Sequence, residues 1–271
     1  MSYIKVNEDL EGLLSNIKCF ALDLDGTFYL SNTMIPGSLS FLEKLQQRGI
    51  SFVFVTNNSS KSCRAYVKKL ATMGVEIDEK YIISSGRATI EYLKREHYGK
   101  KVFLLGNPML IEEFIEKGIV IDDKNPDIVI TAYDTTIDYE KMCKVCDFVR
   151  AGLPYIATHP DYNCPIVGGY IPDIGAIHAF IHASTGRMPE IIIGKPYKEI
   201  MECALNQMGH NADETAMIGD RLYTDIAMSQ HVPGLTGVLV LSGESTLADV
   251  ETAEVKPHLV FDNLAAIAKL I

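Results

Sequence analysis

The chain has 271 residues, 47% of them hydrophobic and 22% charged, which is the composition of an ordinary globular protein with a sizeable core. At roughly 150 residues per domain, this length predicts about two domains, or one domain with a large insertion. The formal net charge of −10 argues against nucleic acid or an anionic membrane as the main partner, because like charges repel.

The N-terminal residues and the cysteines indicate the compartment. The first ten residues show no basic start followed by an apolar core, so we expect no signal peptide. No apolar run approaches the length of about 20 residues that spans a bilayer. The six cysteines are therefore expected to be reduced thiols in a cytoplasmic protein. Cys143 and Cys146 have redox-motif spacing, but they lie inside a helical pattern, which favours a structural role.

Apolar runs typical of strands alternate with helical patterns along the chain, which predicts an α/β fold with mainly parallel strands. The predicted strands are Ile17–Leu24, Phe52–Val55, Tyr81–Ser84, Val102–Leu105, Ile128–Ala132, Tyr155–Thr158, Ile191–Ile193, Thr215–Ile218, Gly237–Leu241 and Leu259–Phe261. The predicted helices are Gly37–Arg48, Ser62–Met73, Ala88–Glu96, Met109–Glu116, Tyr139–Ala151, Ile174–Thr185, Tyr197–Met208, Leu222–Gln230, Thr246–Val250 and Leu264–Leu270. No linker is evident, so a second domain is expected to be an insertion.

The first predicted strand ends in Asp23 and Asp25, with one residue between them. Side chains alternate faces along a strand, so the two carboxylates are expected to point the same way. Like charges at the end of a buried strand are costly unless a partner neutralises them, and Mg²⁺ prefers carboxylate, carbonyl and water oxygens. The alternative is a solvated turn, because Asp and Gly are common at strand ends.

Polar side chains also follow three later strands: Thr56 and Asn57 the second, Lys195 the seventh, and Asp220 the eighth, with Asp225 five residues on. Ligands of parallel α/β sheets bind outside the carboxyl ends of the strands. These residues are therefore expected to converge on one ion and one phosphoryl group.

In this order the residues resemble the four motifs of the haloacid-dehalogenase superfamily of phosphatases. The matching segments are Asp23-Leu24-Asp25-Gly26-Thr27, Thr56, Lys195 in Gly194-Lys195-Pro196, and Gly219-Asp220 with Asp225. Residues 55–59, 185–187 and 193–196, with the long insertion between the second and third motifs, resemble the NagD/4-nitrophenylphosphatase branch. The resemblance implies a Rossmann-like parallel-sheet core, residues 1–82 and 185–271, with an inserted α/β cap domain, residues 83–184.

The resemblance also implies a role for each motif residue. Asp23 is the expected nucleophile, which forms an aspartyl-phosphate, and Asp25 the general acid and base. Mg²⁺ is expected on the Asp23 carboxylate, the Asp25 carbonyl and Asp220. Asp225 is a further ligand through water, an orienting residue or a helix cap. Lys195 neutralises the nucleophile and a phosphoryl oxygen, and the expected phosphate donors are Thr56, Gly26, Asn57 and Asn58.

The cap is expected to close over the core and to select the substrate through the loop residues Asp161, Tyr162, Asn163 and Cys164. Asp173 departs from the branch, which usually has Gly there, and either caps the next helix or alters the pocket. His178 and His182 are spaced like a metal pair, but no Glu accompanies them, so we expect core or surface histidines.

The expected function is Mg²⁺-dependent hydrolysis of small phosphorylated metabolites, such as sugar phosphates or nucleotides, by a possible homodimer formed through the cap. Two alternatives remain open from the sequence. One is a phosphotransferase or mutase on the same scaffold, and the other is a non-catalytic phosphate-binding regulatory protein.

Overall fold

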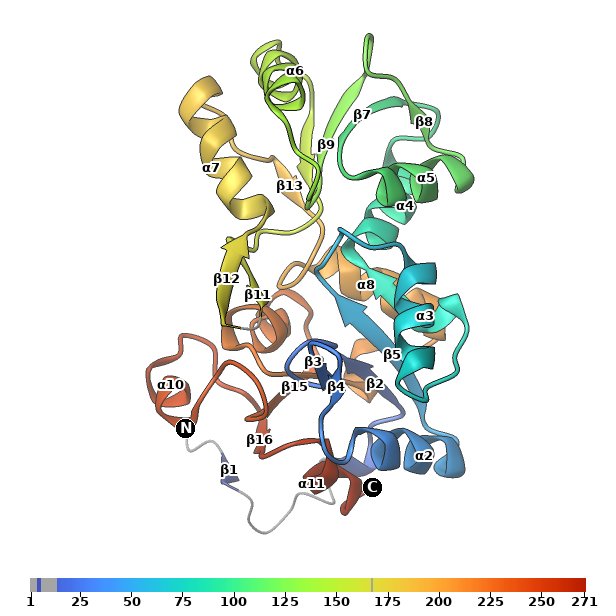
Figure 1. The fold of residues 1–271 in the computed structure, drawn as a ribbon. Helices are drawn as coiled ribbons and strands as arrows, with labels where there is room; N and C mark the ends of the chain where they lie inside the picture. Colours follow the sequence, from blue (N-terminus) through green and yellow to red (C-terminus); the bar gives the residue numbers. More distant parts are fainter. Residues whose placement is uncertain (1–3, 6–13, 167) are drawn as a thin grey trace. The chain divides into compact units, whose positions relative to one another are not determined.

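The computed structural model describes residues 4–5, 14–166 and 168–271 (Figure 1). The expectation of no signal peptide rests on the first ten residues, of which residues 1–3 and 6–10 lie outside the described residues. The chain forms two compact units, of residues 1–56, 67–83 and 195–271 and of residues 57–66 and 84–194. The division into core and cap domains stays a prediction; the second unit includes residues 185–194, which we had placed in the core.

A seven-stranded sheet forms the centre of the first unit, in the order β1-β16-β15-β14-β2-β5-β6. Its strands are β1 Ile4–Lys5, β2 Cys19–Leu22, β5 Ser51–Thr56, β6 Ile82–Ser84, β14 Thr215–Gly219, β15 Thr236–Val240 and β16 Leu259–Phe261. Every strand pair for which a register is described is parallel. All four residues of β2 are buried, as an apolar run in a sheet covered on both faces requires.

Helices flank this sheet (Figure 1), which confirms the predicted α/β fold. They are α2 Ser38–Arg48, α8 Lys198–Met208, α9 Met228–His231, α10 Leu247–Thr252 and α11 Leu264–Ala268, together with α3 Cys63–Thr72, which crosses from one unit to the other. Short 3₁₀ turns lie at Glu79–Tyr81 and Ala212–Glu214. Helix α11 lies against α2, where Gly37 leaves room for Ala265: a Cβ on this glycine would lie 2.3 Å from that of Ala265.

The second unit has its own parallel sheet of five strands, in the order β13-β10-β9-β7-β8. The strands are β7 Lys101–Leu105, β8 Val120–Ile121, β9 Ile128–Thr131, β10 Tyr155–Ala157 and β13 Ile191–Ile192. The helices are α4 Ser85–Glu96, α5 Pro108–Glu116, α6 Tyr139–Arg150 and α7 Ile174–Thr185. Figure 1 shows α6 and α7 on one side of the sheet and α4 and α5 on the other. A buried cluster that includes Val129, Val149 and Ile181 joins α6 and α7 to the strands.

Two short antiparallel hairpins were not predicted. They are β3 Tyr29–Leu30 with β4 Thr33–Met34, and β11 Asn163–Ile166 with β12 Gly169–Pro172. Their strands are largely exposed and lack the apolar alternation that identifies a half-buried strand.

The other predictions about the chain concern membrane segments and cysteines. Within the described ranges, no helix has the length and apolar character needed to cross a membrane. The six cysteines are free thiols, and Cys143 and Cys146 lie on α6, as predicted.

Candidate active site

Three neighbouring strands of the first unit place polar side chains at one edge of the sheet. Leu22, the last residue of β2, is paired with Ile218 of β14 and with Phe54 of β5. Asp23 therefore follows directly beyond this register, and its N–H donates to the carbonyl of Ile218 at 2.9 Å. Asp220 follows β14, and Thr56 is the last residue of β5.

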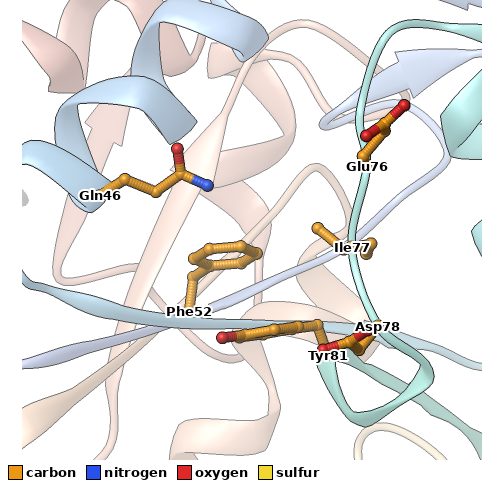
Figure 2. A pocket seen from close by; sticks show the side chains of 6 residues that line it. All are labelled: Gln46, Phe52, Glu76, Ile77, Asp78 and Tyr81. Carbon is orange, nitrogen blue, oxygen red and sulfur yellow. The ribbon is translucent and has the colours of Figure 1, made fainter.

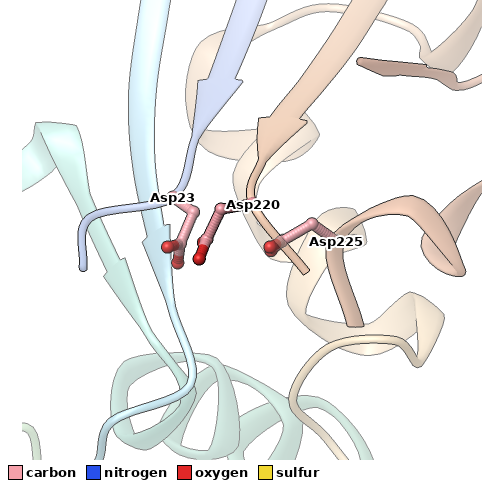
Figure 3. Close-up of side chains that lie close together, drawn as sticks. All are labelled: Asp23, Asp220 and Asp225. Carbon is pink, nitrogen blue, oxygen red and sulfur yellow. The ribbon is translucent and has the colours of Figure 1, made fainter. Parts of the chain in front are cut away.

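Three of the predicted acids meet at this edge. Carboxylate oxygens of Asp23, Asp220 and Asp225 lie within 4.8 Å of one another, and all three residues are buried (Figure 3). Buried carboxylates this close repel one another unless a cation lies among them. An all-oxygen donor set of this kind suits a hard divalent cation.

Lys195 supplies one of the cations at this edge, and its side chain is only 3% exposed. Its Nζ donates to Oδ1 of Asp23 at 2.5 Å and to Oδ1 of Asp225 at 2.6 Å. A third bond, to the carbonyl of Val55 at 3.1 Å, uses the remaining proton of the ammonium group. Burial favours the neutral amine, but Asp225 and Asp23 outweigh it and raise the pKa of Lys195.

The expected route by which Lys195 reaches the site was wrong. We predicted that it follows a strand of the sheet that carries Asp23, but β13 pairs with β10 in the second unit. Lys195 begins the last segment of the first unit instead. A two-residue strand in the sequence does not reveal which sheet it joins, because its partner lies far along the chain.

The electrostatics of the acids follow from burial. Burial raises the pKa of Asp23 to about 8; nearby Asp225 and Asp220 raise it further and Lys195 opposes the rise. Burial, together with the nearby charge of Asp225, raises the pKa of Asp220 to about 6. The hydrogen bond that the N–H of Glu244 donates to this carboxylate acts in the opposite direction. The site therefore lacks positive charge when only protein groups are present.

Two glycines enclose the carboxylate of Asp220. A Cβ on Gly26 would lie 2.4 Å from Oδ2 of Asp220, and one on Gly243 would lie 2.0 Å from the same oxygen. Gly26 also has a φ of 91°, which other residues rarely adopt. The N–H of Glu244 donates to this oxygen at 2.7 Å. The segment around Gly243 was missed in the sequence, because a lone Gly in a loop is no signal of a site.

Asp225 bonds both to Lys195 and to the start of the π-helical turn in which it lies. Its Oδ1 accepts from Lys195, and its Oδ2 accepts from the N–H of Arg221 at 3.1 Å. Leu222–Ile226 forms a π-helical turn rather than the predicted start of an α-helix, and the α-helix begins only at Met228. The turn brings Asp225 back over Gly219, where a Cβ would lie 2.1 Å from the Asp225 carboxyl carbon. Such turns are frequent at functional sites.

The carboxylate of Asp25 is not part of the acidic group, contrary to the expectation that it points with Asp23. Strand β2 ends at Leu22, so the alternation of a strand no longer applies two residues later. The backbone of Asp25 forms an isolated parallel β-bridge with Tyr29. The hydroxyl of Tyr29 also donates to the Asp25 carboxylate at 3.4 Å. Its carbonyl, the expected ligand atom, stays a prediction.

The other predicted site residues belong to the second unit. Asn57 is buried, and its Nδ2 donates to Oδ1 of Asp161 at 3.0 Å. The side chain of Asn58 accepts from the N–H and the hydroxyl of Ser60. Tyr162 is exposed, and Asn163 and Cys164 begin β11. Their contact with a substrate stays a prediction.

Two questions that the sequence left open are answered in the second unit. Asp173 caps helix α7, and its carboxylate accepts from the N–H of Ile174 at 2.6 Å. His178 is a core histidine bonded to Oγ1 of Thr131 at 2.9 Å, and His182 is exposed.

One hollow of the first unit lies apart from the motif residues. It has a volume of about 370 Å³, and its lining residues are Gln46, Phe52, Glu76, Ile77, Asp78 and Tyr81 (Figure 2). The rings of Phe52 and Tyr81 stack with centroids 5.0 Å apart. None of the residues predicted to act on phosphate lines this hollow.

Comparison with known proteins agrees with the geometry. Residues 20–120 match the model of the haloacid dehalogenase-like hydrolases, and residues 192–267 match a HAD-hydrolase-like model. An acid sugar phosphatase of Staphylococcus aureus is 36% identical over 95% of this chain and 99% of its own length. The ribonucleotide monophosphatase NagD of Escherichia coli is 34% identical over 94% of this chain and 98% of its own length. The crystal structure of a 4-nitrophenylphosphatase from Thermotoga maritima superposes with a TM-score of 0.92 at 46% identity, over 95% of this chain and 98% of that one.

Proposed function

The chain belongs to the haloacid dehalogenase-like hydrolases, as a phosphatase of this family, and we propose that it hydrolyses small phosphate monoesters through an aspartyl-phosphate on Asp23 with Mg²⁺ as cofactor. One observation carries the proposal: Asp23, Asp220, Asp225 and Lys195 meet at the edge of the sheet. No simpler structural role requires three buried acids to meet there with a buried lysine bonded to two of them.

In the first step, an oxygen of Asp23 attacks the phosphorus of the ester. The bond from phosphorus to the leaving oxygen breaks, and Asp25 donates a proton to that oxygen. In the second step, Asp25 takes a proton from water, which attacks the phosphorus and breaks its bond to Asp23. Inorganic phosphate leaves, and the free carboxylate is restored.

The protein groups around Asp23 favour this chemistry. Lys195 orients the nucleophile through its 2.5 Å bond and opposes the rise in the pKa of Asp23 that burial causes, and Asp225 holds the lysine in place. Thr56 and the backbone after it, together with Gly26, are proposed to donate hydrogen bonds to the phosphoryl oxygens.

The residues present fit a magnesium ion. The Asp23 and Asp220 carboxylates and the carbonyl of Asp25 would hold it, with the Asp225 carboxylate nearby. The close packing of two glycines against the Asp220 carboxylate restricts where that ligand can lie. When bound, the ion supplies positive charge that offsets the repulsion between Asp23 and an anionic phosphate.

Small phosphorylated metabolites are the proposed substrate class. The relatives are named for sugar phosphates, ribonucleotides and nitrophenyl phosphate, which are all small esters. The segment with Asp161, Tyr162, Asn163 and Cys164 is proposed to select among them. We also propose that the protein is cytoplasmic, which its free cysteines support. The family resemblance supports the further proposal of a homodimer that forms through residues of the inserted segment.

The test is hydrolysis of p-nitrophenyl phosphate by the full chain with Mg²⁺, with EDTA, and by Asp23→Asn with Mg²⁺. Activity is expected only in the first case. Asp123→Asn is the matched control, because Asp123 is an exposed acid that pairs with Lys144 of the second unit, away from the motif residues. Turnover by Asp23→Asn equal to that of the wild type would exclude Asp23 as the nucleophile.

A further inference from the structure

One buried histidine of the second unit, His159, takes no part in the proposed mechanism. His159 is 0% exposed and lies between two acids. Its Nδ1 is 3.7 Å from Oδ2 of Asp161, and its Nε2 is 3.5 Å from Oδ1 of Asp173. Each ring nitrogen therefore faces one carboxylate within ion-pair distance. Because unpaired buried charges are costly, the ring and the acids depend on one another.

The two acids lie on the two stems of the β11–β12 hairpin. Asp161 precedes β11, and Asp173 follows β12 directly. Backbone bonds join the stems: the N–H of Asp173 donates to the carbonyl of Tyr162 at 2.9 Å, and that of Gly175 donates to the carbonyl of Asp161 at 2.8 Å. A Cβ on Gly175 would lie 2.4 Å from the carbonyl oxygen of Pro160, so the stems approach closely only because a glycine is there.

The contacts continue from Asp161 to Asn57. The other oxygen of the Asp161 carboxylate, Oδ1, accepts from Nδ2 of Asn57 at 3.0 Å. The carbonyl of Asn57 accepts from the hydroxyl of Ser85 at 2.5 Å. A Cβ on Gly194 would lie 2.6 Å from Oδ1 of Asn57, so the amide side chain is enclosed as well. Asn57 is therefore fixed both at its backbone and at its side chain.

Asn57 follows Thr56, the last residue of β5, so its backbone sets the path of the chain just after a proposed phosphate donor. We propose that His159 is a positioning residue for catalysis: through Asp161 it fixes Asn57, and thereby the backbone that binds the phosphoryl group, while Asp173 braces the ring. This inference rests on the proposed function.

A double-mutant cycle between His159 and Asn57 tests the proposal. The four proteins are the wild type, His159→Asn, Asn57→Ala and the double variant, each as the full chain with Mg²⁺. The readouts are kcat/KM for p-nitrophenyl phosphate and the inhibition constant of inorganic phosphate. Each single change is expected to lower kcat/KM about tenfold, the effect of one lost hydrogen bond, and to weaken phosphate inhibition.

The double variant decides the outcome. If His159 acts through Asn57, the double variant is no slower than the slower single variant, because the second change has nothing left to disturb. Additive losses, about a hundredfold together, would overturn the proposal and leave His159 as a structural link between the stems.

Two controls separate positioning from folding. His178→Asn removes another buried histidine of the same unit, and it is expected to lower Tm while kcat/KM and phosphate inhibition stay unchanged. If His159→Asn does not fold, Asp173→Asn replaces it in the cycle, because it removes the charge that faces the other ring nitrogen.

Failure of the proposed function gives a different result. A folded wild type without turnover would contradict the phosphatase proposal, and the same cycle is then measured by calorimetry as the affinity for inorganic phosphate with Mg²⁺. Non-additive affinities would still support the positioning role, and additive affinities or an absence of phosphate binding would overturn it.

Discussion

The Nζ atom of Lys195 lies 2.5 Å from Oδ1 of Asp23, although 172 residues separate the two in sequence. The same nitrogen donates to Asp225, so one buried cation serves two buried carboxylates. Removal of one partner from such a group leaves buried charge uncompensated, which costs about 3–5 kcal/mol in measured cases. Lys195 is thus expected to matter for stability as well as for turnover.

Lys195→Met is expected to abolish hydrolysis and to lower the free energy of unfolding of the metal-free protein by about 3 kcal/mol. Urea unfolding in EDTA measures the second effect. Lys198→Met is the control: Lys198 is exposed and paired with the half-buried Glu202, so its loss is expected to change stability by less than about 1 kcal/mol. Equal midpoints for the two variants would contradict this view of the lysine.

Several elements and the motif residues were predictable because their signals are local. The apolar run of β5, predicted as Phe52–Val55, occupies Ser51–Thr56, and the helix predicted at Ile174–Thr185 has those bounds. The convergence of Asp23 and Asp220 followed from parallel strands, whose carboxyl ends share one edge. Lys195 reached the same place by another path, which no local pattern reveals.

Mg²⁺ is expected to stabilise the protein more at pH 8 than at pH 6. Burial raises the pKa of Asp23 to about 8 in the metal-free protein, so the folded state retains a proton that the unfolded state has lost. The contribution of Asp23 to stability in EDTA therefore falls as pH rises from about 4 to about 8. Tm measured with and without Mg²⁺ across this range tests the sign.

Asp23→Asn is the control for this pH dependence, because its side chain cannot ionise. The variant is expected to show a smaller decline of Tm with pH in EDTA than the wild type. A metal-induced rise in Tm that is the same at pH 6 and pH 8 would speak against a protonated acid in the metal-free site.

His178 is expected to make the protein sensitive to acid. Burial, with the charge of His159, lowers the pKa of His178 to about 3, so the folded state favours the neutral ring. The stability from the neutral ring is complete above about pH 6.5 and is lost as pH falls toward about 3. At about 1.4 kcal/mol per pKa unit, the two units between pH 6.5 and pH 4.5 correspond to a loss of up to about 3 kcal/mol.

Urea unfolding at pH 7.5 and pH 4.5 measures the effect of His178. His178→Gln is expected to lose less stability between these pH values than the wild type. The exposed His182 provides the comparison, and His182→Gln is expected to behave like the wild type. A wild-type response in His178→Gln would show that other groups cause the acid sensitivity.

The parts of the site that sequence did not predict depend on tertiary contacts. Gly243 is needed only because Asp220 lies against it, and the π-helical turn at Leu222–Ile226 forms where Asp225 bonds back to Arg221. Asp173 differs from the branch pattern in sequence, yet only the fold shows His159 beside it. Residues whose role is to leave space or to orient a neighbour have no pattern of their own.

Gly243→Ala is expected to weaken metal binding without unfolding the protein. The added Cβ would lie 2.0 Å from Oδ2 of Asp220, so the carboxylate must move away from its bond with the N–H of Glu244. Loss of a group that orients a metal ligand typically costs about 10–100-fold in metal affinity or activity. We therefore expect half-maximal hydrolysis of p-nitrophenyl phosphate to need at least about tenfold more Mg²⁺ than in the wild type, with a Tm that stays well above the assay temperature.

Gly169→Ala is the matched control, because a Cβ at Gly169 meets nothing within 4 Å. An unchanged magnesium requirement in Gly243→Ala would mean that Asp220 does not hold the ion from the position that the structure gives it.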